Sequence, residues 1–171
     1  IGRMAGLLFA KEGAKVALID VSLKTKDETL ALFAGQGSEA MFLQGDVADP
    51  ASAKSMIDAV AASFGKLDIL VNCAGIAPAE KTVGKNGAHG LASFSKTITV
   101  NLIGSFNMIR LAADAMCKND PESTGERGVL ISTASVAAYD GQIGQAAYSA
   151  SKGGIVGMTL PIARDLARNG I

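Results

Sequence analysis

The chain has 171 residues, of which 49% are apolar, and its 16 lysines and arginines balance its 16 aspartates and glutamates. This length is enough to bury one substantial core, so we expect a single domain over residues 1–171. The absence of net charge and of long basic runs removes the usual electrostatic case for binding nucleic acid or an anionic membrane. No apolar run approaches the length of a membrane span. We therefore expect a small molecule as the partner.

The two cysteines, Cys73 and Cys117, lie far apart in the chain. They have neither metal-ligand spacing nor a disulfide framework, which indicates a reducing compartment and no metal site. The chain opens with a helix-like segment that leads at once into an apolar strand, and it closes where a helix has just finished. We expect it to be cut at both ends, so a lost targeting sequence is not excluded.

Short apolar runs alternate along the chain with longer amphipathic ones. The clearest helix covers residues 50–64, with Asp49 as N-cap, Pro50 in the first turn and Gly65 at its end. Repeated strand–helix–strand order predicts a Rossmann-like α/β fold, a doubly wound parallel sheet with helices on both faces in three α/β/α layers. Its buried parallel strands are expected at residues 15–20, 40–46, 68–75 and 128–135.

The only long loop that we expect runs from residue 76 to residue 92, and loops of this length are often functional or mobile. It contains His89, the one histidine of the chain, which we expect to be solvated. Two later helical segments, 102–117 and 148–168, carry apolar or small residues on more than one face. Each should bury one face on the sheet and another on a neighbouring subunit, which predicts a homodimer or homotetramer.

Asp20 closes the first apolar strand, eighteen residues after Gly2. A dinucleotide-binding fold places an acidic residue on the adenosine ribose at an interval of ~20 residues. Such a carboxylate would also repel a 2′-phosphate, so NAD is favoured over NADP as the cofactor. The alternative is a solvated aspartate that merely ends a strand. Gly2 would be the tail of the glycine-rich turn that binds the cofactor phosphates.

Small residues end the next two strands, at 45–47 and at 72–75. They let the backbone approach a flat ligand, and Asp46 is suited to accept from an adenine amino group while Val47 packs against the ring. Cys73 is interpreted as a small wall residue rather than a nucleophile, because no base lies nearby in sequence. The second group of cofactor-binding candidates is Asn72, Cys73, Ala74 and Gly75.

Tyr148 and Lys152 are four residues apart and surrounded by small residues. If a helix begins here, the two side chains share one face, and the ammonium stabilises the phenolate form of the tyrosine. Tyr148 would then serve as a general base near neutral pH. Ser135, thirteen residues earlier at the end of a strand, is placed to reach the same point and to bind a substrate oxygen. A tyrosine in the core with a lysine along the surface is the alternative.

The sequence resembles the short-chain dehydrogenase/reductase family on these residues: Ser135 with Tyr148 and Lys152, the strand-end Asp20, and residues 72–75. The resemblance covers the whole chain. It implies Tyr148 as the acid/base, Lys152 as the residue that tunes it and binds the nicotinamide ribose, and Ser135 as the residue that orients the reacting oxygen. Asn101 matches the asparagine that holds a water beside the lysine.

Residues 132–167 and the long loop resemble one subgroup of this family, which interconverts 3-hydroxyacyl-CoA and 3-ketoacyl-CoA with NAD and also oxidises hydroxysteroids. The resemblance implies mitochondrial location for an animal protein and cytoplasmic location for a bacterial one. Two alternatives stay open: a 3-oxoacyl-carrier-protein reductase, which usually takes NADPH, and a scaffold role in a tRNA-processing complex. By the same resemblance Gln142 lies near the substrate, together with Ser135 and Tyr148, and NAD contacts Ile1, Asp20, Asp46, Val47 and Cys73.

Overall fold

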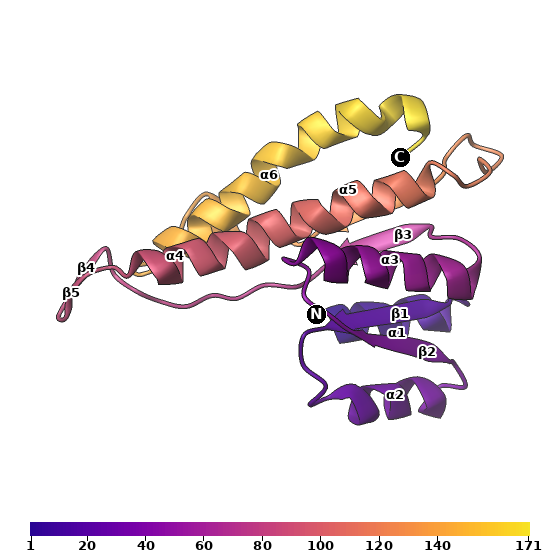
Figure 1. Cartoon of the computed structure of the whole chain (residues 1–171), viewed down its shortest axis with the longest axis horizontal. Coiled ribbons are helices and arrows are strands. Elements are labelled where there is room, and N and C mark those ends of the chain that lie inside the picture. The colour runs from indigo at the N-terminus through magenta and orange to yellow at the C-terminus, as the bar shows by residue number, and fades with distance from the viewer.

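The computed structural model describes residues 1–171 and has an α/β fold in which helices cover both faces of parallel strands (Figure 1). None of its helices combines the length and the apolar character needed to cross a membrane. The elements follow in the order α1 (Gly2–Lys11), β1 (Val16–Asp20), α2 (Lys26–Gly35), β2 (Ala40–Gln44), α3 (Pro50–Phe64), β3 (Ile69–Asn72), β4 (Val83–Gly84), β5 (Gly87–Ala88), α4 (Leu91–Ile98), the π-helical turn η1 (Thr99–Ile103), α5 (Gly104–Met116), β6 (Val129–Ser132), the 3₁₀ turn η2 (Val136–Ala138), α6 (Ala146–Leu166) and the 3₁₀ turn η3 (Ala167–Asn169).

All four expected strands are present, and they form two separate parallel pairs. β1 pairs with β2 from Val16 opposite Ala40, and β3 pairs with β6 from Ile69 opposite Val129. β1 and β3 do not pair with each other, so the continuous sheet expected from the sequence is divided into two halves. Each of these strands therefore has one backbone edge that no strand of this chain covers.

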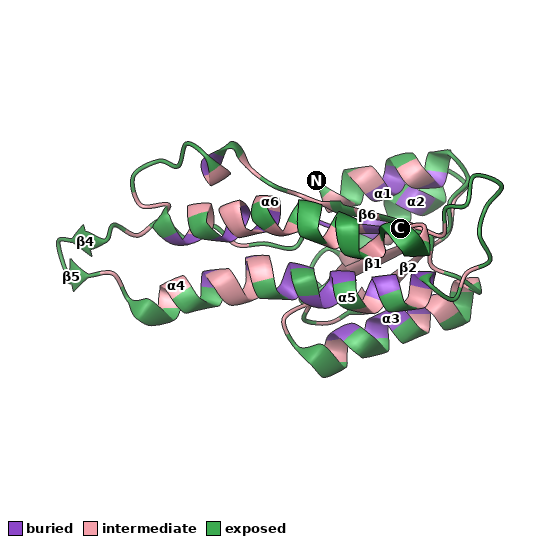
Figure 2. Cartoon of the chain, turned by 90° about the horizontal axis from the view of Figure 1, so that it is seen from above, coloured by how far each residue is buried: buried purple, intermediate pink, exposed green.

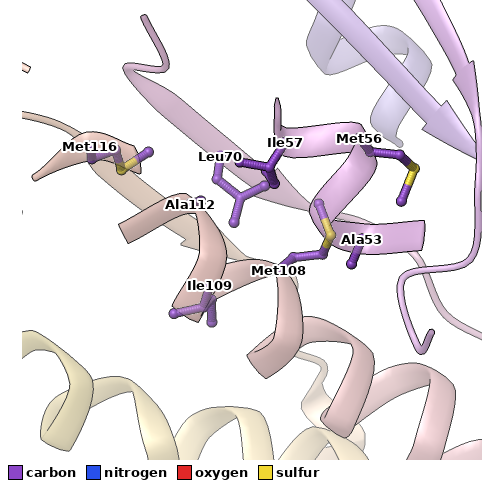
Figure 3. Packing of buried hydrophobic residues seen from close by; sticks show 8 residues of the cluster. All are labelled: Ala53, Met56, Ile57, Leu70, Met108, Ile109, Ala112 and Met116. Carbon is purple, nitrogen blue, oxygen red and sulfur yellow. The ribbon is translucent and has the colours of Figure 1, made fainter. Parts of the chain in front are cut away.

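The strands lie between two apolar cores, which confirms the expected layers. On one face, α1 and α2 enclose a small core around Phe33, against which Leu18 of β1 packs. On the other face, Ile19 of the same strand packs against a larger core. Successive side chains of a strand point to opposite faces, so β1 is covered on both. The larger core joins α3, β3 and α5 through Ala53, Met56, Ile57, Leu70, Met108, Ile109, Ala112 and Met116 (Figure 3).

Helix α3 has the start and the end predicted for it. The side chain of Asp49 accepts a hydrogen bond from Ser52 N at 2.6 Å, and Pro50 occupies the first turn. Gly65 ends the helix in the left-handed conformation at φ 85°, where glycine carries no steric cost. The apolar side of α3 is thereby directed onto the larger core, and its N-terminus follows directly on the end of β2.

The long loop and the helix after it differ in detail from the prediction. Residues 83–88 form the β4–β5 hairpin, which projects from the far end of the molecule and is exposed throughout (Figures 1 and 2). The helix expected from residue 102 begins earlier, because α4, η1 and α5 follow one another without a break. The middle of this rod is buried over the strands, which brings its polar residues to the ends of β2 and β3 (Figure 2).

Candidate active site

The first two strands end in two carboxylates at one edge of the pair. Asp20 is exposed, and its Oδ1 accepts from Ser22 N at 2.9 Å. Asp46 is exposed as well, and its Oδ1 accepts from Ala48 N at 2.8 Å. A backbone bond from Gly45 N to the carbonyl of Asp20 holds the two strand ends together. The second carboxylate oxygen of each aspartate has no partner within the chain and is available to a ligand.

The end of β3 meets the start of α1 and the end of β6. A Cβ on Gly2 would lie 3.4 Å from Cβ of Cys73, so the first turn of α1 lies against Cys73. The hydroxyl of Thr133, which follows β6, donates to the carbonyl of Asn72 at 2.7 Å. The side chain of Asn72 is buried, with Nδ2 3.4 Å from the carbonyl of Ser105, so it points toward α5 rather than to the open edge. Ala74 and Gly75 are exposed, and so is Ile1, which precedes α1.

Tyr148 and Lys152 lie on one face of α6, as their spacing predicts. Helix α6 begins at Ala146, and Nζ of Lys152 lies 5.7 Å from the centroid of the Tyr148 ring. Lys152 is only 5% exposed, and its ammonium donates to the carbonyl of Thr133 at 2.6 Å. The buried ammonium thus lies beside the Tyr148 ring and is held by a backbone carbonyl.

Ser135 stands at the start of η2, which packs against α6. Its hydroxyl accepts from Ala137 N at 3.2 Å and forms no hydrogen bond with Tyr148. The same hydroxyl keeps its own proton for donation, because accepting one bond does not use it. The structure therefore brings Ser135, Tyr148 and Lys152 into one region formed by the end of β6 and the start of α6.

Asn101 is fully buried in the π-helical turn η1, and its amide joins two other segments. Its Oδ1 accepts from Ile76 N at 2.8 Å, and its Nδ2 donates to Ile76 O at 2.8 Å and to Ser151 Oγ at 3.0 Å. Ser151 in turn donates to the carbonyl of Tyr148 at 2.7 Å. Asn101 thus positions the loop after β3 and the first turn of α6, as π turns at functional sites often do. A water held beside Lys152 stays a prediction.

Gln142 is exposed in the turn before α6, where its backbone N donates to Gln145 Oε1 at 2.9 Å. The same turn is held from the other side, because Glu80 N donates to the carbonyl of Gly144 at 2.9 Å. Gly144 has φ +86°, and a Cβ there would lie 3.3 Å from Glu80 N, so this close approach requires glycine. The long loop thereby supports the segment that carries Gln142.

The expectation that His89 is solvated is wrong. Its side chain is 12% exposed, with Nδ1 3.1 Å from the carbonyl of Glu80 and Nε2 3.6 Å from Oε2 of the same residue. The other carboxylate oxygen of Glu80 accepts from Gly90 N at 2.7 Å. This backbone hydrogen bond, with smaller effects from Ser93 and His89, lowers the pKa of the Glu80 carboxyl. Glu80 and His89 together close the base of the β4–β5 hairpin.

Sequence reasoning missed three residues that organise this region: Thr133, Ser151 and Glu80. Thr133 and Ser151 lie close in sequence to Ser135 and Lys152, but nothing in the sequence distinguishes them from the other small polar residues there. Glu80 had no signal beyond its place in a long loop. No cluster of three or more histidine, cysteine or acidic side chains is arranged to hold a metal ion.

A family model described as short chain dehydrogenase matches residues 1–171. The chain belongs to the short-chain dehydrogenase family. Within this family it is 47% identical, over 173 residues that include all of this chain and 67% of the relative, to 3-hydroxyacyl-CoA dehydrogenase type-2 of Drosophila melanogaster. This confirms the family expected from Ser135, Tyr148 and Lys152, and with it the oxidoreductase class.

Solved structures of short-chain dehydrogenases have the same fold. 3-Hydroxyacyl-CoA dehydrogenase type-2 from Mycobacterium avium is 35% identical with a TM-score of 0.86, and the match covers 99% of this chain and 66% of that one. An NAD+-bound xylitol dehydrogenase is 30% identical with a TM-score of 0.88, over 99% of this chain and 62% of that one. The chain thus spans 62–67% of the length of these three proteins.

The Glu80 carboxylate should make the stability of this short-chain dehydrogenase depend on pH. Its pKa is below the ordinary 4.5, so its stabilising effect is present above that value and is lost as pH falls through the folded-state pKa. We expect Glu80→Gln to lower the free energy of unfolding near neutral pH, by an amount that shrinks below about pH 4.5. Urea unfolding across this range measures it, with the exposed Glu39→Gln as control. A difference in unfolding free energy between Glu80→Gln and the unmodified protein that does not change with pH would contradict a stabilising role for the ionised Glu80 carboxylate.

Proposed function

We propose that the protein is an NAD-dependent dehydrogenase that interconverts 3-hydroxyacyl-CoA and 3-ketoacyl-CoA. The observation that carries this proposal is the pairing on α6 of Tyr148 with a buried Lys152, next to the turn that holds Ser135. A phenol, a buried ammonium and a hydroxyl in one region suit the transfer of a proton to or from an alcohol oxygen. The substrate class is supported by two relatives whose names specify 3-hydroxyacyl-CoA.

The residues at the strand ends fit NAD. Asp20 is exposed with one free carboxylate oxygen, which suits the adenosine ribose hydroxyls. The ammonium of Lys152 has three donors and uses one of them on Thr133, so it retains donors for the nicotinamide ribose. The xylitol dehydrogenase with the same fold is described with bound NAD+. The remaining residues proposed for NAD are Ile1, Gly2, Asp46, Val47, Asn72, Cys73, Ala74, Gly75 and Tyr148.

The chain's own residues account for the movement of the proton. In the oxidative direction the phenolate of Tyr148 accepts the proton of the substrate hydroxyl, and the charge of Lys152 stabilises that phenolate. Ser135 donates to the same substrate oxygen and keeps it in place as its charge changes. When bound, NAD supplies the chemistry of hydride acceptance. In the reductive direction Tyr148 returns the proton to the oxygen.

The alternative of a 3-oxoacyl-carrier-protein reductase uses the same three catalytic residues. It differs in the cofactor, because such enzymes usually take NADPH. The exposed carboxylate of Asp20 favours NAD, since it would face the additional phosphate of NADP with a like charge. Gln142, exposed in the turn before α6, is proposed to contact the substrate of either enzyme.

Tyr148→Phe tests the proton transfer. The change removes only the hydroxyl and retains the ring, so we expect kcat to fall by ~10²-fold or more while NAD binding is little changed. Kinetics with acetoacetyl-CoA and NADH, with cofactor binding measured in parallel, check this. Near-normal turnover in a folded variant would contradict the mechanism and favour the scaffold role. In the same assays, Ser135→Ala should mainly reduce turnover. Lys152→Ala should reduce turnover and weaken cofactor binding.

Asp20→Ala tests the cofactor. The unchanged enzyme should prefer NADH to NADPH, and the variant should narrow this preference because it removes both the ribose contact and the repulsion of the phosphate. The ratio of kcat/KM for the two cofactors is the measurement. Equal or better turnover with NADPH before any substitution would overturn the NAD assignment and favour the carrier-protein reductase.

We also propose that the chain assembles as a homodimer or homotetramer. Ile103 and Phe106 lie exposed on the outer side of the α4–α5 rod, and Leu160 is exposed on α6. These large apolar side chains, on helices whose other faces are buried, suit an interface between identical subunits. Light scattering should give a dimer or a tetramer at micromolar concentration. A stable monomer would contradict this proposal.

A further inference from the structure

We propose that Asn107 and Arg110 of α5 are positioning residues for the adenine half of the cofactor. This inference rests on the proposed function, in which the turn that contains Asp46 and Val47 receives the adenine ring. Neither α5 residue belongs to the catalytic group at Tyr148. Both act on the turn through a series of hydrogen bonds, and the last bond of this series is to the Asp46 carboxylate.

Asn107 makes the hydrogen bond from α5 to this turn. It is 5% exposed, and its Nδ2 donates to the carbonyl of Val47 at 2.8 Å across 60 residues of sequence. The other bonds of residues 46–49 are to α3 or within the turn itself: Asp46 N donates to Ser52 Oγ at 3.0 Å, and Asp49 N donates to the carbonyl of Asp46 at 3.2 Å. Asn107 therefore ties the turn to the buried helix.

Arg110 determines which way the Asn107 amide faces. Its Nε and Nη2 both donate to Oδ1 of Asn107, at 3.0 and 2.7 Å. A guanidinium has donors and no acceptor, so it can bind only the oxygen of the amide. With Oδ1 held toward Arg110, Nδ2 is left to donate to Val47. Without Arg110 the Val47 carbonyl alone would hold the amide in this orientation, so the amide and its bond to Val47 would be less strictly aligned.

The peptide between Val47 and Ala48 transmits this arrangement to Asp46. The carbonyl of Val47 and the N–H of Ala48 belong to one planar unit, so fixing the carbonyl also fixes the direction of the N–H. That N–H donates to Oδ1 of Asp46 at 2.8 Å. The orientation of the Asp46 carboxylate, proposed to accept from the adenine amino group, thus depends on Asn107.

Gly104, one turn before Asn107, lets the Val47 turn lie directly on the helix. A Cβ at this position would be 2.7 Å from Cγ2 of Val47 and 3.4 Å from Ala48 N. Real Cβ atoms essentially never approach as closely as the first of these distances. Because there is no gap between the helix and the turn, a small change in the length or direction of the Asn107–Val47 hydrogen bond moves the turn itself.

The test compares two substitutions in the full-length enzyme. Asn107→Asp keeps the shape and still accepts from Arg110, but it has no donor for Val47. Arg110→Met replaces the guanidinium by an apolar side chain and so removes its hydrogen bonds to the Asn107 amide. Because Arg110 is exposed whereas Asn107 is buried, this variant serves as the test if Asn107→Asp does not fold. Arg110→Lys is the conservative variant, and Arg164→Met, on the exposed surface of α6, is the matched control.

The loss of one hydrogen bond predicts about a tenfold rise in the KM for NADH and in the dissociation constant of ADP-ribose. ADP-ribose carries the adenine half of the cofactor without nicotinamide, so it reports on the turn without turnover. We expect kcat and the KM for acetoacetyl-CoA to remain unchanged, partial recovery in Arg110→Lys, and no effect in Arg164→Met. A merely structural role would instead change all parameters together with the unfolding midpoint.

Unchanged ADP-ribose affinity in folded Asn107→Asp and Arg110→Met would overturn the inference. So would a fall in kcat with no change in ADP-ribose affinity. Measurements on the unmodified enzyme distinguish failure of this inference from failure of the proposed function. If it binds ADP-ribose but does not reduce acetoacetyl-CoA, the substrate assignment fails and the inference is still tested by affinity. If it does not bind ADP-ribose, both are wrong.

Discussion

The organisation of the candidate active site depends on one buried ammonium. Lys152 is almost fully enclosed and donates to the carbonyl of Thr133, and an unpaired charge in this position would be strongly destabilising. The hydroxyl of Thr133 in turn donates to the carbonyl of Asn72, so the ammonium is linked through Thr133 to the end of β3.

The rod formed by α4, η1 and α5 is the second organising feature, because it binds the ends of two different strands, β2 and β3. Asn101 binds both backbone groups of Ile76 after β3, and Ser105 receives the side chain of Asn72 at the end of that strand. Asn107 binds Val47 after β2. Polar residues inside an otherwise apolar helix are expensive unless they are paired. Here each is paired with a segment at the open edge, so the rod holds both halves of the proposed cofactor site.

Small residues set how closely these parts approach. A Cβ on Gly75 would lie 3.3 Å from Oδ1 of Asn101, and one on Gly154 would lie 2.6 Å from Cδ2 of Leu102. Gly154 of α6 thereby allows this helix to pack closely against the rod at Leu102. This packing keeps Tyr148 and Lys152 close to the strand ends, since α6 cannot withdraw without losing its contact with η1.

Much of the local structure could be predicted from the sequence, because it depends on neighbours in the chain. Apolar runs located the four parallel strands, Asp49 and Gly65 bounded α3, and the spacing of Tyr148 and Lys152 placed both on one face of a helix. The first predicted strand ended correctly at Asp20, but the other three ran too far at their carboxyl ends. Their last small residues turn away from the sheet toward the next helix, and composition does not distinguish a strand from such a turn.

The sequence by itself determined the α/β class and the family, since these follow from local periodicity and from residue types at fixed spacing, and it supplied the proposal for the reacting side chains. The tertiary structure alone decided the pairing of β1 with β2 and of β3 with β6, the burial of His89, the acceptor for Lys152, and the partners of Asn107 and Arg110. The physical reason is that backbone donors and acceptors are alike at every residue. Which of them meet is therefore settled only when distant segments pack together.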